Sequence, residues 1–180
     1  MPRGPFNLNQ MKRILYLHGL ESGQGGPKVD SLAASALVSA PDIDYRQPDQ
    51  WQRLDEMVES GGFDQIIGSS MGGWFAFLLG ERHGIDTLLF NPAFHSRTFE
   101  PEVDFKLDQS LQQHTVVIGR RDDVVAPAPT VEWLAANNVQ ASIHFEPEMG
   151  HRTPLDRFQA WTEAVIFKPS EDVADKRAAK

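Results

Sequence analysis

Short apolar runs alternate along the chain with segments of helical spacing. Residues 13–17 are almost entirely apolar, which is typical of a strand buried on both faces. The same kind of pattern predicts further strands at residues 42–45, 64–67, 87–90, 115–118 and 141–145. Between them, apolar positions at helical spacing predict helices at residues 29–40, 49–59, 71–79, 127–137 and 154–167.

Strands that alternate with helices indicate right-handed β-α-β crossovers. We therefore expect one α/β domain over residues 11–167, in three layers, with a mainly parallel sheet and helices on both faces. Residues 1–10 and 168–180 lack periodicity and are predicted to be flexible tails. In such sheets, ligands bind at the carboxyl ends of the strands.

Charge and composition narrow the class of protein. The 180 residues carry 17 Lys and Arg against 25 Asp and Glu, a net charge of −8, which argues against a nucleic-acid partner. No run approaches the length of a membrane span, so no membrane partner is expected. The chain has no cysteine, which excludes disulfides, thiolate zinc sites and cysteine nucleophiles. We expect a cytoplasmic protein.

The strand–turn–helix unit around residues 68–72 carries the pattern G-x-S-x-G, with Gly68, Ser70 and Gly72 at its fixed positions. This pattern is typical of the nucleophile elbow, a strained turn that exposes the serine hydroxyl above the sheet. The two glycines are needed because a Cβ at either place would crowd the neighbouring strand or helix.

The glycines select Ser70 over its neighbour Ser69. Two residues before and after Ser69 stand Ile67 and Met71, which would not fit the same turn. So short a pattern also recurs by chance, and an ordinary Gly/Ser turn is the alternative.

Position along the chain separates the six histidines that could serve as the general base. His151 lies in the loop between the last predicted strand and the last helix, and it follows the acid in the order serine, acid, histidine. The others are predicted at the far end of the sheet (His83, His114), inside a strand (His144) or at the same end (His18, His95).

The acid is expected in the turn after the strand at 115–118. Asp122 stands three residues after Gly119 and would orient the imidazole of His151. Its neighbour Asp123 is the alternative, expected instead to cap the following turn.

An oxyanion hole would need two backbone N–H donors near the serine. Met71, next after Ser70, and Leu20, at the end of the first strand, are the expected donors. His18 is expected to brace this turn by hydrogen bonds.

Taken together, these motifs resemble the α/β-hydrolase superfamily. The segments 17–20 (LHGL), 68–73 (GSSMGG) and 91–93 (NPA) resemble, more narrowly, the small bacterial YqiA-like esterases, over roughly residues 12–167. The resemblance implies a minimal α/β-hydrolase fold without a cap domain, with Ser70, Asp122 and His151 as the triad.

We therefore expect a serine hydrolase that cleaves small-molecule carboxylic esters through an acyl-enzyme on Ser70, without a metal or organic cofactor. A thioesterase or other acyl hydrolase is one alternative, and a non-catalytic binding protein that retains the fold is another. The oligomeric state stays open.

Any cap over the acyl site would have to lie in residues 91–113, which are long enough only for a short lid. Phe94, Phe99 and Phe105 are expected to line one wall of the pocket or to pack against the sheet edge. Such a shallow pocket favours short acyl chains.

Overall fold

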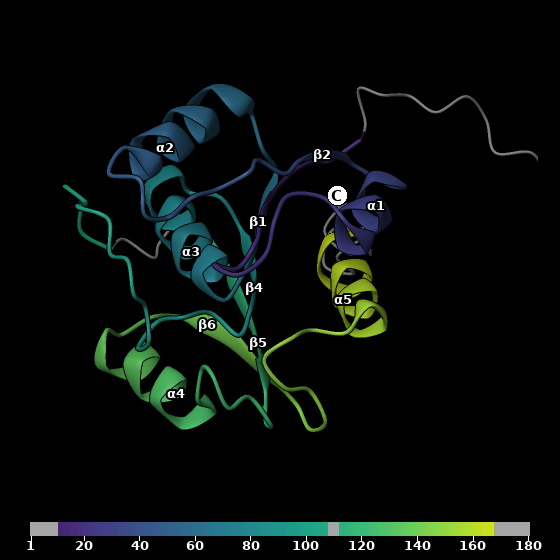
Figure 1. Cartoon of the computed structure of the whole chain (residues 1–180), viewed down its shortest axis with the longest axis vertical. Coiled ribbons are helices and arrows are strands. Elements are labelled where there is room, and N and C mark those ends of the chain that lie inside the picture. The colour runs from purple at the N-terminus through teal and green to yellow at the C-terminus, as the bar shows by residue number, and fades with distance from the viewer. Residues whose placement is uncertain (1–10, 108–111, 168–180) are drawn as a thin grey trace, which may run out of the picture.

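A six-stranded parallel sheet runs through the middle of the protein (Figure 1). The computed structural model describes residues 11–107 and 112–167, so the two predicted tails lie outside the described residues. The strand order is β2-β1-β3-β4-β5-β6. The strands are β1 (Arg13–Leu17), β2 (Leu37–Ser39), β3 (Gln65–Ser69), β4 (Thr87–Phe90), β5 (His114–Gly119) and β6 (Ala141–Glu146).

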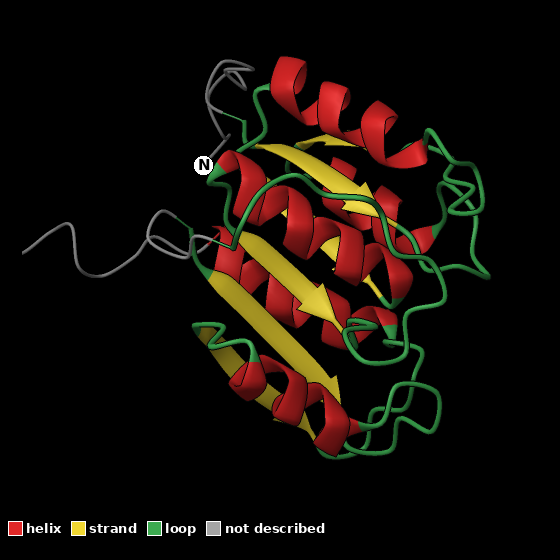
Figure 2. Ribbon diagram, turned by 90° about the vertical axis from the view of Figure 1, so that its left-hand side faces the viewer, coloured by secondary structure: helices red, strands yellow, loops and turns green. Residues whose placement is uncertain are grey.

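Helices cover both faces of the sheet, which gives the three predicted layers. One face carries α1 (Pro27–Ala33) and α5 (Leu155–Thr162), and the other carries α2 (Gln50–Gly61), α3 (Met71–His83) and α4 (Pro127–Ala136) (Figure 1). A π-helical turn, Glu163–Phe167, follows α5. In Figure 2 the arrows run in one direction, and long loops gather at the edge to which they point.

Alternate residues of β1 enter two separate parts of the core. Leu15 and Leu17 pack with α2, α3 and α4, whereas Ile14 and Tyr16 pack with residues of α1 and α5. Because α3 packs on the sheet and is flanked by α2 and α4 (Figure 1), Met71 through Glu81 are all buried. This explains why the helix is apolar on every side.

The region between β1 and α2 differs from its prediction. The helix predicted at 29–40 ends at Ala33, and the second strand is Leu37–Ser39 instead of residues 42–45. Pairing with β1 determines where the second strand lies. Leu37 N–H donates to the Lys12 carbonyl (2.9 Å), and residues 37–39 pair with residues 13–15 from that point on. Ile43 and Tyr45 are buried as expected, but they belong to a loop.

The remaining predicted elements are confirmed, with ends shifted by a few residues. Within residues 91–107 and 112–113 the chain forms no helix or strand, so no cap domain follows β4 in the described part of the chain. None of the helices among the described residues is long and apolar enough to cross a bilayer.

Candidate active site

Ser70 occupies a strained turn between β3 and α3. Its backbone has φ 55° and ψ −120°, a region that residues other than glycine seldom adopt. Its N–H donates to the Phe90 carbonyl (3.0 Å), and its carbonyl accepts the N–H groups of Gly73 (2.9 Å) and Ala93 (3.0 Å). These bonds hold the turn in its strained form, at the carboxyl edge of the sheet.

The crowding predicted at the two glycines is confirmed. A Cβ on Gly68 would lie 2.3 Å from the Gly72 carbonyl oxygen, and a Cβ on Gly72 would lie 2.2 Å from the Leu17 carbonyl oxygen. Both separations are far below van der Waals contact, and the atoms met are backbone atoms that cannot move aside. Only glycine therefore fits two residues before and two residues after Ser70.

Asp122 and His151 form a hydrogen-bonded pair. Nδ1 of His151 donates to Oδ2 of Asp122 at 2.9 Å, with Oδ1 at 3.1 Å. The Asp122 side chain is fully buried, whereas that of His151 is 24% exposed. Since Nδ1 carries the proton in this pair, Nε2 is left as the nitrogen that can accept one.

The turn after β5 is capped by Asp122 itself rather than by Asp123. Oδ1 of Asp122 accepts the N–H groups of Val124 (2.9 Å) and Val125 (2.7 Å). The prediction that Asp123 caps this turn is therefore wrong, and its exposed side chain lies at the pocket rim. The buried carboxylate thus accepts hydrogen bonds from three N–H donors, those of Val124, Val125 and His151.

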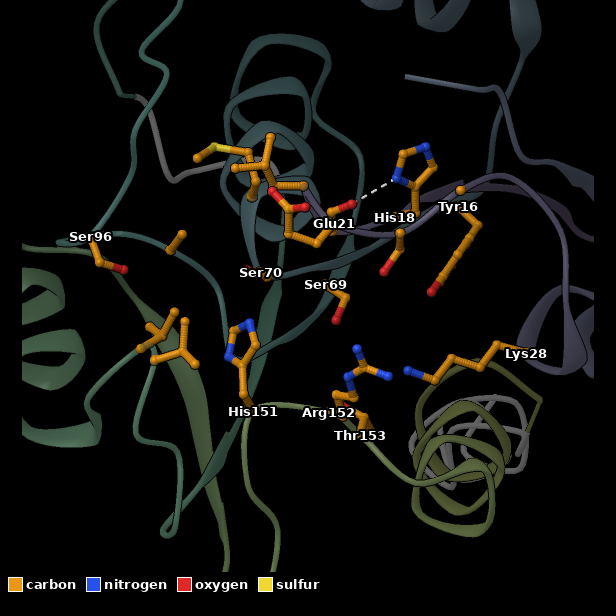
Figure 3. Close-up of a pocket in the computed structure, with 18 of the residues that line it drawn as sticks. Tyr16, His18, Glu21, Lys28, Ser69, Ser70, Ser96, His151, Arg152 and Thr153 are labelled. Atoms are coloured by element: carbon orange, nitrogen blue, oxygen red, sulfur yellow. Dashed lines mark hydrogen bonds between the residues drawn. The ribbon is translucent and has the colours of Figure 1, made fainter. Parts of the chain in front are cut away.

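One pocket brings together residues that the sequence separates widely. Ser70 and His151 line a cavity of about 980 Å³, and Leu20 and Met71 line it too. Figure 3 shows the ring of His151 pointing toward Ser70. The turn after β1 lies against the serine, because a Cβ on Gly19 would be 3.4 Å from the Ser70 Cβ.

His18 lines the same pocket but is occupied by backbone hydrogen bonds. Its Nδ1 donates to the Gly19 carbonyl (2.8 Å), and its Nε2 accepts the Ile43 N–H (3.1 Å). The Asp42 carboxylate is farther away, at 3.8 Å from Nε2. Because an acceptor Nε2 carries no proton, His18 is neutral and braces the turn, as predicted.

The other histidines lie where the sequence placed them. At the amino end of the sheet, Nε2 of His114 donates to Glu81 (2.7 Å) and Nε2 of His83 donates to Asp55 (2.7 Å). The remaining two make contacts elsewhere: His144 packs against the Trp161 ring, and His95 contacts Thr130.

Of the two arrangements expected for Phe94, Phe99 and Phe105, the pocket wall is wrong, because none of the three lines the pocket of Ser70. Phe94 is completely buried and stacks on Trp133 in the core, while Phe105 stacks on Trp51. Phe99 lines a separate, smaller cavity beside Trp51. All three pack on the α2–α3–α4 side of the sheet, where apolar and aromatic side chains surround them.

Asn91 holds the loops of the site together, a role that the sequence analysis missed. Its Nδ2 donates to the carbonyls of Gly150 (2.9 Å) and His151 (3.0 Å), and its Oδ1 accepts the Gly119 N–H (2.7 Å). Asn91 is 1% exposed and has φ 43°. A single buried amide thus connects the ends of β4 and β5 to the loop of His151.

No group of three or more His, Cys, Asp or Glu side chains within residues 11–107 and 112–167 is arranged to hold a metal ion.

Comparisons with known proteins agree with the fold. The model of UPF0227, an uncharacterised protein family, matches residues 13–126. Among solved structures, a protein of Xanthomonas campestris pv. campestris assigned to the alpha/beta hydrolase superfamily is 21% identical with a TM-score of 0.63. That match covers 86% of this chain and 99% of the other.

Two further structures show the same similarity. A Bacillus cereus carboxylesterase is 19% identical, with a TM-score of 0.58 and coverage of 86% of this chain and 87% of its own. Est1E from Butyrivibrio proteoclasticus is 13% identical, with a TM-score of 0.62 and coverage of 88% and 89%. At these identities the likeness concerns the fold alone, and it confirms the predicted α/β-hydrolase architecture.

We expect Asn91→Asp to destabilise the protein. The carboxylate keeps the shape of the amide but cannot donate to the carbonyls of Gly150 and His151, and it adds a buried charge. The free energy of unfolding should fall by about 2–4 kcal/mol, measured by urea denaturation. Asn138→Asp is the matched control, since Asn138 also has positive φ (53°) but is exposed. Equal stabilities of the two variants would contradict the role given to Asn91.

Proposed function

Because the chain belongs to the UPF0227 family and has the α/β-hydrolase fold, we propose that it is a serine hydrolase that cleaves small carboxylic esters. The observation that carries this proposal is the hydrogen bond of 2.9 Å between the buried Asp122 and His151, whose ring lines the same pocket as Ser70. The carboxylesterase of the same fold from Bacillus cereus agrees with this reaction class.

In the proposed reaction, Oγ of Ser70 attacks the ester carbonyl carbon while Nε2 of His151 takes the hydroxyl proton. Asp122 stabilises the resulting imidazolium through Nδ1–H. The tetrahedral intermediate then expels the alkoxide, which receives the proton from Nε2, and the acyl group remains on Ser70. Water, deprotonated by the same nitrogen, releases the acid and restores the serine.

The backbone N–H groups of Leu20 and Met71 are the proposed donors to the oxyanion. Two observations support them: both residues line the pocket with Ser70, and the turn that carries Leu20 lies against the Ser70 side chain. The amino end of α3 begins at Met71, so its dipole also favours negative charge at this place.

We expect Ser70→Ala to lower kcat for p-nitrophenyl butyrate by about 10⁴-fold or more, the usual loss for a triad member. Ser69→Ala, the matched control one residue away, should keep most of the activity. A fluorophosphonate probe should label wild type and Ser69→Ala but not Ser70→Ala. Equal losses in both variants would refute the assignment, and absence of labelling and turnover in the wild type would refute the enzyme itself.

The same assay should separate the two aspartates. In Asp122→Asn, the amide oxygen can still accept the N–H groups of Val124 and Val125, so the turn should persist. The amide would favour the wrong imidazole tautomer, and kcat should fall by about 10⁴-fold. Asp123→Asn should stay within a few-fold of wild type. If Asp123→Asn is folded but inactive, the acid of the triad is Asp123 and not Asp122.

We expect the protein to prefer esters with short acyl chains. Ala93, Val124 and Val125 give the pocket an apolar side, but Val124 is 60% exposed, so the pocket is open there. Each buried CH₂ contributes about 0.8 kcal/mol, and this gain ends where the chain reaches water. We expect kcat/KM for p-nitrophenyl esters to peak between roughly C2 and C6. A maximum at C12 or longer would contradict the open pocket.

A further inference from the structure

Two cationic side chains face the same part of the pocket. Lys28, on α1, and Arg152, next to His151, both line the cavity that contains Ser70. Figure 3 shows the Lys28 ammonium and the Arg152 guanidinium pointing toward each other, on the side of the pocket where Tyr16 and Ser69 lie. The proposed reaction gives neither side chain a role.

Neither cation forms an ion pair with a carboxylate among the described residues. Lys28 is half-buried, its Nζ lies 5.5 Å from the centre of the Phe158 ring, and burial lowers the pKa of its ammonium. Two like charges that face the same part of a pocket without a counterion repel each other. An anion between them would remove that cost.

The neighbouring groups suit an anion as well. Tyr16 directs its hydroxyl to this side of the pocket (Figure 3), and burial raises the pKa of Tyr16 to about 12, so at neutral pH the hydroxyl remains a hydrogen-bond donor. The hydroxyl of Ser69 is a second donor beside it. Because Ser69 directly precedes Ser70 in the chain, a ligand bound here would lie close to Ser70.

Of the two carboxylates that line the pocket, Glu21 lies away from the two cations. Glu21 lies on the far side of Ser69 from Arg152 in Figure 3 and is within 3.7 Å of Arg46. Asp123 comes from the turn after β5, beside the apolar Val124 and Val125. The cations thus come from α1 and from the loop before α5, whereas the apolar Val124 and Val125 come from the turn after β5.

We propose that Lys28 and Arg152 form an anion subsite, and that the substrates are esters that carry a carboxylate or phosphate group. The assignment of an ester rests on the proposed function, whereas binding of the anion does not. Charge-assisted hydrogen bonds from Lys and Arg to such groups are stronger than neutral ones, so the subsite sets which esters are used efficiently.

The test compares neutral and anionic esters of matched length. Wild type, Lys28→Met and Arg152→Gln are assayed with p-nitrophenyl butyrate, mono-p-nitrophenyl glutarate and the butyrate ester of 3-carboxy-4-nitrophenol. The second ester carries its charge on the acyl group and the third on the alcohol. The measured quantity is the kcat/KM of each anionic ester divided by that of the neutral one, which cancels any general change in reactivity.

For at least one anionic ester, this ratio should fall about tenfold in each variant, as expected for the loss of a charge-assisted contact. Which ester responds tells whether the charge belongs to the acid or to the alcohol. Lys12→Met is the matched control, since Lys12 is exposed and precedes β1 at the other end of the sheet; its ratio should equal that of wild type. Unchanged ratios in Lys28→Met and Arg152→Gln for both esters would overturn the subsite.

A binding measurement separates this proposal from the proposed reaction. Inorganic phosphate and glutarate should raise the melting temperature of wild type and of Ser70→Ala, and the rise should shrink in Lys28→Met and Arg152→Gln. This holds even if no ester is hydrolysed. If the protein hydrolyses esters but neither anion raises its melting temperature, the proposed hydrolase activity stands and the proposed anion subsite is wrong.

Discussion

The close approach of three backbone segments around Ser70 is the constraint on which the site depends. Gly72, in the first turn of α3, lies against the Leu17 carbonyl at the end of β1, and Gly68 lies against the carbonyl of Gly72. A single methyl group at either position would push α3 off the sheet. Because the contact is between backbones, it fixes the serine relative to β1 and β3 at once and places the turn after β1 beside it.

The opposite wall of the site is fixed by polar contacts. The side chain of Asn91 binds the backbone at Gly119 and at the loop of His151, and Gly119 can lie against the Met149 carbonyl only because it has no Cβ. Asp122 then spans the gap between the two loops, with the turn N–H groups on one side and the imidazole on the other. Each of these groups is satisfied by the next, so the loops adopt one arrangement rather than several.

Local signals in the sequence predict most of this structure, and contacts between distant residues account for what they miss. The apolar runs of β1 and β4 coincide with their strands because both are buried on two faces. The short edge strand β2 was misplaced because residues 37–39 were assigned to the helix expected at 29–40, and only pairing with β1 identifies them as a strand. Asn91 looked like an ordinary turn residue, since its partners lie 59 and 60 positions away.

The net charge of the chain disfavours binding of an anion, whereas the charges of Lys28 and Arg152 favour it. Which effect is larger depends on the distance from the anion to each charge. The chain carries −8 overall, which repels anions, but at physiological ionic strength that repulsion is screened beyond about 8 Å. For a small anion bound by Lys28 and Arg152, as proposed, screening would be weak, so the two cations would dominate there. A net charge of −8 is thus compatible with the proposed binding of a single carboxylate or phosphate beside Ser70.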